Sequence, residues 1–529
     1  MGWMVHQAGV RGKFALLPGE ISRRSAGPTT AVARPSPSRE KSAEAVVPAG
    51  SLPNGKGRTS GGDSKVAGSS EQQGQLRLPF GDPARDVGVK PRGPEMGLSF
   101  SAAPPLDEPA ATEDLLEQVL GRDNLFQALA RVKANRGAPG IDGMTITQLP
   151  EYLMEHWSSI REALMSGTYQ PSPVRRVEIP KPGGGERLLG IPTVLDRLIQ
   201  QALSQVLGGL FDPHFSDASF GFRPGRSAHQ AVRKAQGFVR EGRSWVVDVD
   251  ITRFFDRVNH DKLMARVARR VKDKRVLKLI RLYLESGVML GGVCVRTEEG
   301  TPQGGPLSPL LSNVLLDDLD KELERRGHAF VRYADDCNIY VCSRRAGERV
   351  KEGVTRFLAA RLSLEVNEAK SAVERPWKRK FLGFSFTPDA RIRLAPQTLE
   401  RAQARFCQLT RRWRGQSLEQ TLADLNAYAR GWAGYFALAE TPSPFRDLDA
   451  RLRRRLRAIL WHQWKNRGTR LQNLVALGIP VRQAKRVAYS GKGPCRISHS
   501  RPLDAALDNA FWRTRGLVSL AEIQKKRYA

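Results

Sequence analysis

Two β-rich runs that carry carboxylates constrain the fold of this chain most strongly. The run SWVVDVDI at 244–251 contains Asp250 near its end, and FVRYADDCNIYVCS at 330–343 holds Asp335 and Asp336 between two short predicted strands. A carboxylate within an apolar strand is costly unless it is paired or bound to a cation. Three carboxylates at strand ends would suit Mg²⁺, which binds carboxylate, water and phosphate oxygens. Without its surroundings, the pair of neighbouring aspartates would instead indicate an ordinary hairpin turn.

The rest of the chain predicts alternating helices and strands, followed by a helical region. Apolar residues at helical spacing predict helices near 113–135, 148–166, 194–210, 261–286 and 347–364. Ser227 and Asn259 are expected as helix N-caps. Strands are expected at 174–180 and 187–192, which form a hairpin, and at 381–386. From about 396 onward the chain is expected to be almost wholly helical.

The charge of the chain indicates a polyanionic partner. The 529 residues include 85 Lys and Arg against 54 Asp and Glu, a formal net charge of +31. Residues 391–529 hold 28 basic and 9 acidic residues, a net +19, so the C-terminal quarter carries most of the excess. No stretch approaches the roughly 18 apolar residues of a membrane span, so nucleic acid is favoured over a membrane. Five cysteines without a C-x-x-C pair favour a reduced cytoplasm.

The carboxylates stand among ordered motifs that resemble a known family. Asp250 with Phe254-Phe255, the loop TPQGGPLSPLLSN (301–313) and YADD (333–336) follow the order and spacing of motifs A, B and C of a reverse transcriptase palm. Further matches are NRGAPGIDGMT, IPKPGGGERLLGIPTVLDRLIQQAL, SFGFRPGRSAHQAV, LEVNEAKS, FLGFSF and LNAYARGWAGYF. The chain thus resembles, over roughly 113–529, the bacterial group II intron-encoded reverse transcriptases that also act as maturases.

The resemblance implies a right-hand polymerase of the α+β class, with an antiparallel sheet in the fingers and palm and an all-α thumb. We expect four parts: a disordered extension rich in Gly, Pro and Ser at 1–112, fingers and palm at 113–390, a thumb or maturase (X) region at 391–485, and a small DNA-binding region at 486–529. Longer members append an H-N-H endonuclease with cysteine pairs. Because Cys495 is the one cysteine in the last region, we expect the compact type that lacks an endonuclease.

The resemblance also assigns roles by position. The residues that match ligands of two Mg²⁺ ions, with Mn²⁺ as an alternative, are Asp250, Ile251 through its carbonyl, Asp335 and Asp336. Asp248 shares a strand face with Asp250 and is ranked as accessory. Lys370 matches a proton donor to leaving pyrophosphate. The nucleotide-binding matches are Lys181 and Arg187 for the triphosphate, Phe255 to exclude a 2′-hydroxyl, and Gln303 near the ribose and template base.

Arginines are the expected nucleic-acid contacts. Arg223 and Arg226, before the helix that Ser227 caps, would contact a template phosphate. Two basic stretches, RRWRG and RLRRRLR, would contact structured RNA through Arg411, Arg412, Arg453, Arg454 and Arg455. Most of the tryptophans interleaved with the basic residues of this C-terminal part are expected to lie in the thumb core. Asp256 and His260, which match an FFDxxxH signature, are expected to be structural.

The resemblance implies an RNA-directed DNA polymerase and maturase of the bacterial cytoplasm, close to the nucleoid when it acts on DNA. Its partners would be its group II intron RNA, target DNA with a primer, and dNTPs, without a membrane. Two alternatives remain open. One is a domesticated reverse transcriptase of the retron, diversity-generating or CRISPR-associated kind, which shares the palm. The other is an RNA-binding splicing factor without polymerase activity. The intact Asp250, Asp335 and Asp336 do not favour this alternative.

Overall fold

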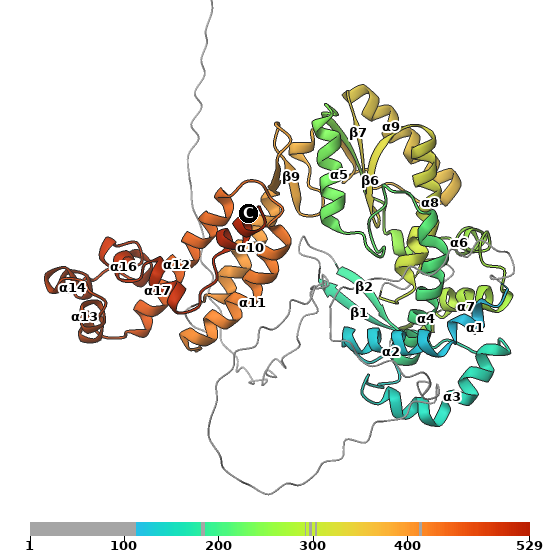
Figure 1. Ribbon diagram of the computed structural model, residues 1–529, viewed down its shortest axis with the longest axis horizontal. Helices are drawn as coiled ribbons and strands as arrows, with labels where there is room; N and C mark the ends of the chain where they lie inside the picture. Colours follow the sequence, from blue (N-terminus) through green and yellow to red (C-terminus); the bar gives the residue numbers. More distant parts are fainter. Residues whose placement is uncertain are drawn as a thin grey trace, which may run out of the picture. The chain divides into compact units, whose positions relative to one another are not determined.

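The computed structural model describes residues 113–528, except 181–185, 291–292, 296–298, 302–303 and 412–414. The expected disorder of 1–112 and the tip of the expected hairpin therefore lie outside the described residues. Figure 1 shows the described helices and strands and labels many of them. Among these helices, none is both long and apolar enough to cross a lipid bilayer.

The N-terminal part is helical. Its helices are α1 Leu115–Val119, α2 Arg122–Asn135, α3 Leu149–Met165 and α4 Val194–Phe211. Their apolar faces contribute to one large core. The sequence predicted a single helix near 113–135, but the chain turns between α1 and α2 at Gly121, which has a non-helical ψ of 138°. A Cβ atom at this glycine would lie only 3.0 Å from the Gln118 carbonyl oxygen, so the small residue permits the turn.

A four-stranded sheet with the order β2-β1-β4-β5 follows the first helices. Its strands are β1 Val174–Pro180, β2 Glu186–Ile191, β4 Val288–Leu290 and β5 Val293–Val295. β1 and β2 pair antiparallel, with Arg175 opposite Ile191 and Pro180 opposite Glu186, which confirms the predicted hairpin. β4 lies parallel to β1 and antiparallel to β5.

A second four-stranded sheet, with the order β6-β7-β3-β8, carries the carboxylates. Its strands are β3 Trp245–Val249, β6 Ala329–Tyr333, β7 Asp336–Val341 and β8 Ala372–Glu374, and every neighbouring pair is antiparallel. The helices of this part are α5 Ala228–Arg240, α6 His260–Val267, α7 Lys274–Glu285, α8 Ser308–Arg325 and α9 Arg344–Phe357. Short helical turns are η2 Asp212–His214, η3 Phe254–Asp256, η4 Leu358–Leu362 and η5 Pro376–Lys378. α5 contacts β6 and β7, whereas α9 contacts β3, β7 and β8. Figure 1 labels α5, α9, β6 and β7 of this part.

Side-chain caps determine where the helices of this part begin. Ser227 caps α5 by accepting from the Gln230 N–H, and Asn259 caps α6 by accepting from the Lys262 N–H, as the sequence predicted. The predicted helix at 261–286 is instead two helices. The buried Asp273 accepts from the Arg275 N–H and thereby starts α7 as a new helix.

The C-terminal part is helical after a two-stranded sheet of β9 Phe384–Phe386 and β10 Ile392–Leu394. Its helices are α10 Pro396–Leu409, α11 Leu418–Phe436, α12 Ser443–Gln463, α13 Arg467–Ala476, α14 Val481–Ala488, α15 Pro494–Ile497, α16 Arg501–Ala506, α17 Asn509–Thr514 and α18 Leu520–Lys526. The predicted change from mixed structure to helices near residue 396 is therefore confirmed.

The last helices share the core of the thumb helices before them. Trp512 and Leu520 are buried in the same apolar cluster as Trp461 of α12. The carboxylate of Asp449 on α12 caps α18, because it accepts from the Ser519 hydroxyl over 2.7 Å and from the Leu520 N–H over 2.9 Å. Within the described part of 486–529, which the sequence suggested as a separate region, α15 thus contacts α12, and α18 contacts both α11 and α12.

Candidate active site

The first carboxylate follows directly after β3. The backbone N–H of Asp250 donates to Ser371 Oγ over 2.9 Å, and its carbonyl oxygen accepts from the Asn367 N–H over 2.8 Å. Both partners belong to the segment that leads into β8. The backbone is therefore held on one side, while 33% of the side-chain surface of Asp250 stays exposed.

The other two carboxylates belong to the hairpin turn between β6 and β7. Tyr333 ends β6 and pairs with Asp336, the first residue of β7, so Ala334 and Asp335 form the turn. Ala334 adopts a left-handed conformation with a φ of 58°, which a tight two-residue turn requires. Because the ends of β3 and β7 pair antiparallel, Asp250 and Asp336 lie at the same edge of the sheet.

A cleft of about 610 Å³ opens at this edge. Its acidic lining residues are Asp248, Asp250 and Asp336, and its basic ones are Lys370, Lys378, Arg379 and Lys380. Asp335 lies half-buried in the adjoining turn. The structure thus brings together the carboxylates and the lysine that the sequence predicted, from three separate segments of the chain.

Burial and nearby carboxylates raise the proton affinity of Asp336. The surrounding protein raises the pKa of Asp336 to about 7, and the charges of Asp335, Asp248 and Asp250 contribute to this increase. Asp336 as a whole residue nevertheless keeps exposed surface, and it lines the cleft. Burial also raises the pKa of Asp248, although Arg379 opposes the effect, with its Nη2 2.5 Å from Asp248 Oδ2. Asp248 thus has its own counter-charge, as befits an accessory group.

The donor chemistry at the sheet edge fits a hard divalent cation. Carboxylates and carbonyl oxygens are the ligands that Mg²⁺ prefers. A bound cation would offset the repulsion between Asp336 and its neighbouring carboxylates, which adds to the effect of burial on the pKa of Asp336. In the described part of the chain, no hydrogen bond uses the Ile251 carbonyl oxygen. The types of ligand fit Mg²⁺, but they do not form a complete ligand set. No group of three or more His, Cys, Asp or Glu among the described residues has metal-binding geometry.

A basic stretch that the sequence reasoning missed lines the same cleft. Lys378, Arg379 and Lys380 precede β9, and Gln397 lies in the first turn of α10. Burial lowers the pKa of Lys380, while Asp336 and Asp248 oppose that change. The signal was present as the basic run WKRK directly before the FLGFSF motif. The predicted Lys370 is 67% exposed, with its Nζ 3.7 Å from Asp250 Oδ1.

Backbone contacts hold the half-buried Phe255. Its carbonyl oxygen accepts from the Thr301 N–H over 2.6 Å, and a Cβ atom on Gly300 would lie 2.9 Å from that oxygen. The ring of His260, which is buried, places Nε2 2.7 Å from the Gly300 carbonyl oxygen. His260 therefore joins the segment after β3 to the start of the motif B loop, in agreement with the structural role expected for it.

Three predicted binding residues lie outside the described residues, namely Lys181, Gln303 and Arg412. The backbone of Arg187 is described and lies on β2 opposite Ile179, but its side chain is outside the described part. The roles that the resemblance assigns to these four residues stay predictions.

The structure corrects the role expected for Arg223. Its guanidinium is buried and donates to Asp212 Oδ1 over 2.7 Å, and to the carbonyl oxygens of Ser216 and Ser219 over 2.6 and 3.0 Å. With its donors used inside the protein, Arg223 braces the loop after α4 and does not present itself to a template phosphate. Arg226 is more accessible and pairs with the exposed Asp217.

The predicted thumb arginines divide into two groups. Arg411 is exposed, Arg453 and Arg454 are partly exposed, and within the described residues no hydrogen bond or ion pair engages Arg453 or Arg454. Arg455 instead donates to Thr410 Oγ1 and to the Cys407 carbonyl oxygen at the end of α10, so its expected RNA contact is corrected to a helix-end contact.

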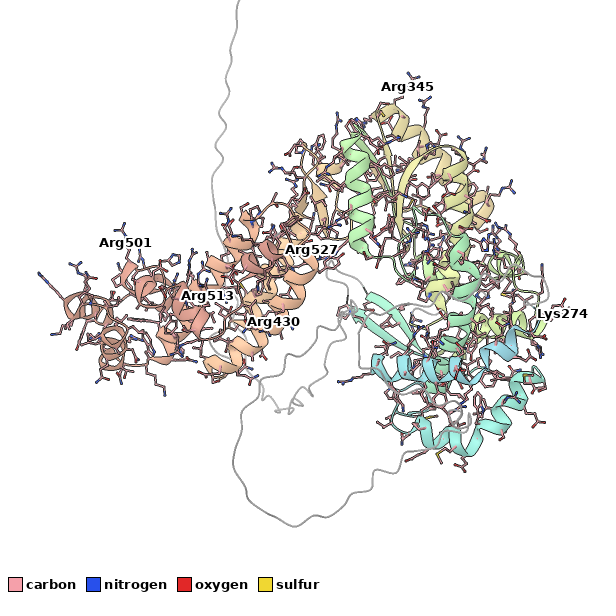
Figure 2. All side chains as sticks on the ribbon, viewed as in Figure 1. Lys274, Arg345, Arg430, Arg501, Arg513 and Arg527 are labelled. Carbon is pink, nitrogen blue, oxygen red and sulfur yellow. The ribbon has the colours of Figure 1, made fainter. Side chains whose placement is uncertain are left out.

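The repulsion between the crowded arginines of α12 is partly offset by an ion pair inside the protein. Arg457, two residues beyond Arg455, pairs with Asp504 of α16. Figure 2 shows further basic side chains at the surface of the helical part, among them the exposed Arg430 and Arg501. Trp432 and Trp461 are buried, as expected for core residues, and Trp464 is partly buried.

Comparisons with known proteins bear on both parts of the chain. Residues 179–386 match the family described as reverse transcriptase (RNA-dependent DNA polymerase), and residues 399–475 match the group II intron, maturase-specific domain. Protein YkfC of Escherichia coli K12 is 32% identical over 321 residues, which cover 53% of this chain and 84% of YkfC. Both the expected family and the right-hand polymerase fold are thereby confirmed.

Two further relatives match smaller shares. Group II intron-encoded protein LtrA of Lactococcus lactis subsp. cremoris is 38% identical over 210 residues, which are 39% of this chain and about a third, 34%, of LtrA. A chain of the partial Cas6-RT-Cas1–Cas2 complex is 28% identical, with 46% of this chain and 42% of that chain covered and a TM-score of 0.31. The match to YkfC and the two domain matches show that this chain belongs to the bacterial group II intron-type reverse transcriptases with a maturase domain.

Proposed function

We propose that this protein copies RNA into DNA at the cleft formed by β3, β7 and the segment before β9. Asp250, Asp335 and Asp336, with the Ile251 carbonyl, would hold two Mg²⁺ ions, which supply activation of a primer 3′-hydroxyl and charge neutralisation on the triphosphate. The observation that carries the proposal is the gathering of Asp248, Asp250 and Asp336 around one cleft at the end of the sheet, where burial and the neighbouring carboxylates raise the pKa of Asp336 to about 7.

The protein's own residues would orient the reactants. Lys370, with its Nζ 3.7 Å from Asp250 Oδ1, is exposed enough to reach a leaving pyrophosphate and give it a proton. The ring of Phe255 would exclude a 2′-hydroxyl and so favour deoxynucleotides. The basic run 378–380 lines the same cleft and would hold the backbone of the primer strand, since phosphates attract lysine and arginine.

We further propose that the helical part binds a group II intron RNA, aids its splicing and thereby presents the intron as a template. Support comes from the maturase-specific match at 399–475 and from the exposed arginines of this part, such as Arg411 and Arg430. Target DNA with a primer and dNTPs would complete the set of substrates during intron mobility, in the bacterial cytoplasm.

One experiment tests the polymerase proposal together with its site. Asp335→Ala is compared with wild type in single-nucleotide primer extension on an RNA template with Mg²⁺, and Asp389→Ala, an exposed aspartate near β10, is the matched control. We expect the first variant to lose extension while RNA affinity stays within about twofold, and the control to behave as wild type. Extension by Asp335→Ala at the wild-type rate would refute the site.

The same proteins distinguish the alternatives. A splicing factor without polymerase activity would leave wild type unable to extend the primer, although it promotes splicing of the intron RNA that flanks its gene. A domesticated reverse transcriptase would extend the primer but would not promote the splicing of any such RNA. The proposed function predicts both activities in one protein.

A further inference from the structure

An ion pair with no direct part in the reaction is buried beneath the catalytic turn. Arg332 of β6 and Asp320 of α8 both have side chains with 0% exposed surface. Arg332 Nε donates to Asp320 Oδ1 over 2.7 Å, and Nη2 donates to Asp320 Oδ2 over 2.5 Å. Burying two charges costs several kcal/mol per ion before their attraction is counted, and apolar residues often stabilise a core as well or better. The pair therefore calls for a role besides stability.

The remaining nitrogen of the guanidinium grips the turn itself. Arg332 Nη1 donates to the carbonyl oxygen of Ala334 over 2.9 Å and to Asn313 Oδ1 over 2.9 Å. Ala334 has a φ of 58° and directly precedes Asp335. A left-handed conformation costs a residue with a side chain roughly 1–2 kcal/mol, so a hydrogen bond to this peptide helps to keep the turn in place.

A third segment closes the network. Asn313 Nδ2 donates to the Gly221 carbonyl oxygen over 2.9 Å, and Gly221 itself lies directly against the backbone of Ala334. The Arg332 carbonyl oxygen accepts from the Phe220 N–H over 2.9 Å. The guanidinium thus joins helix α8 to the turn after strand β6, and the loop at 219–222 is tied to the same network through Asn313 and the Arg332 carbonyl oxygen.

We infer that Arg332 is a positioning residue that fixes the turn carrying Asp335 and Asp336, and that Asp320 and Asn313 hold its guanidinium in the required orientation. The inference rests on the proposed metal-binding role of the two turn carboxylates. Asp320 neutralises the fork formed by Nε and Nη2, and Nη1 is thereby directed at the peptide before Asp335. Lysine cannot replace this function, because a point-like ammonium group cannot engage both partners in a fork.

The test compares Arg332→Lys and Asn313→Ala with wild type and with the control Arg325→Met. Arg325 lies on α8 but pairs at the surface with Glu322, and its side chain is 70% exposed. We measure Mn²⁺ affinity by electron paramagnetic resonance, and kcat, KM and the Mg²⁺ midpoint by primer extension, with active-site titration to count competent molecules. Melting curves identify any variant that fails to fold.

For Arg332→Lys we expect kcat per competent molecule to fall at least about tenfold, since a misplaced catalytic group is costly. KM for the dNTP should stay within about twofold, while the Mn²⁺ dissociation constant and the Mg²⁺ midpoint rise at least about threefold. Asn313→Ala should shift the same quantities in the same direction by a smaller factor, and Arg325→Met should shift none. Wild-type kcat and Mn²⁺ affinity in folded Arg332→Lys would overturn the inference.

A paired variant separates positioning from the burial of charge. Arg332→Met combined with Asp320→Leu removes both charges of the buried pair, so it should fold, yet it should keep the low kcat and the weakened Mn²⁺ binding. Recovery of the wild-type kcat in the paired variant would overturn the inference. If wild type itself made no cDNA, the proposed function would fail instead, and the Mn²⁺ measurement would still decide the role of Arg332.

Discussion

Gly221→Ala tests how closely the loop before α5 supports the catalytic turn. A Cβ atom at this position would lie 2.2 Å from the Ala334 backbone nitrogen and 2.9 Å from the Tyr333 carbonyl carbon. Real Cβ atoms essentially never come within 3.0 Å of such an atom, so the two backbones must separate by about 0.8 Å. Because both contacts are with backbone rather than a flexible side chain, the turn itself has to move.

Such a movement is large compared with what the chemistry tolerates. Metal–ligand distances are held to about 0.2 Å, and a misplacement of about 1 Å can cost about 10²-fold in rate, which corresponds to about 2.7 kcal/mol in the activation barrier. We therefore expect kcat of Gly221→Ala to fall about 10²-fold. Overpacking should also lower the free energy of unfolding by about 1–3 kcal/mol, which leaves a protein of this size folded near room temperature.

The assay is single-turnover addition of one dNTP to an RNA-templated primer, with the folded fraction measured by chemical denaturation. Gly237→Ala is the matched control, because Gly237 lies in helix α5 and, apart from its chain neighbours and the backbone of its own helix, no atom lies within 4 Å of its Cβ position. Alanine there should leave the rate unchanged and stabilise the helix by up to about 1 kcal/mol. A wild-type rate for Gly221→Ala would refute the claim that the turn is held rigidly against the loop.

Three further predictions follow from the site and the helical part. Phe255→Ala should raise the ratio of rNTP to dNTP incorporation at least about tenfold, measured as kcat/KM for each nucleotide; an unchanged ratio would exclude a steric gate. Arg453→Ala and Arg454→Ala should each reduce the slope of log Kd for intron RNA against log salt by about 1, and an unchanged slope would remove them from the interface. Burial, together with the charges of neighbouring carboxylates, raises the pKa of Asp336 from 3.8 to about 7. The metal-free protein therefore loses stability as pH rises between these values, because the unfolded chain deprotonates first. Asp336→Asn should therefore raise the melting temperature of metal-free protein at pH 8 more than at pH 5, and an equal effect at both would contradict the shift.

Local signals in the sequence predicted much of the fold. Caps such as Ser227 and Asn259 start helices through hydrogen bonds to residues three positions away. A few consecutive residues of sequence are therefore enough to predict them. Helix breaks were harder to predict. The helix after Asp273 starts where it does partly because that carboxylate also accepts from the distant Leu116 N–H over 3.0 Å, a contact that no local pattern reveals.

The candidate site was predicted unevenly for a related reason. The carboxylates Asp250, Asp335 and Asp336 could be placed by ordered motifs, and antiparallel pairing then brings them to one sheet edge. The wrong predictions were the nucleic-acid contacts of Arg223 and Arg455. The sequence shows the charge of these arginines but not whether acceptors inside the protein use their hydrogen-bond donors. The buried network around Arg332 depends on partners from α8 and from a loop a hundred residues away, so only the structure reveals it.

Primer extension by the wild-type protein on an RNA template tests the central claim most directly. We predict efficient incorporation of dNTPs with Mg²⁺, little incorporation of rNTPs, and none of either when a chelator removes the divalent ions. Equal use of rNTPs, or extension that persists with the chelator present, would contradict the assignment of the cleft as a metal-dependent, deoxynucleotide-selective polymerase site.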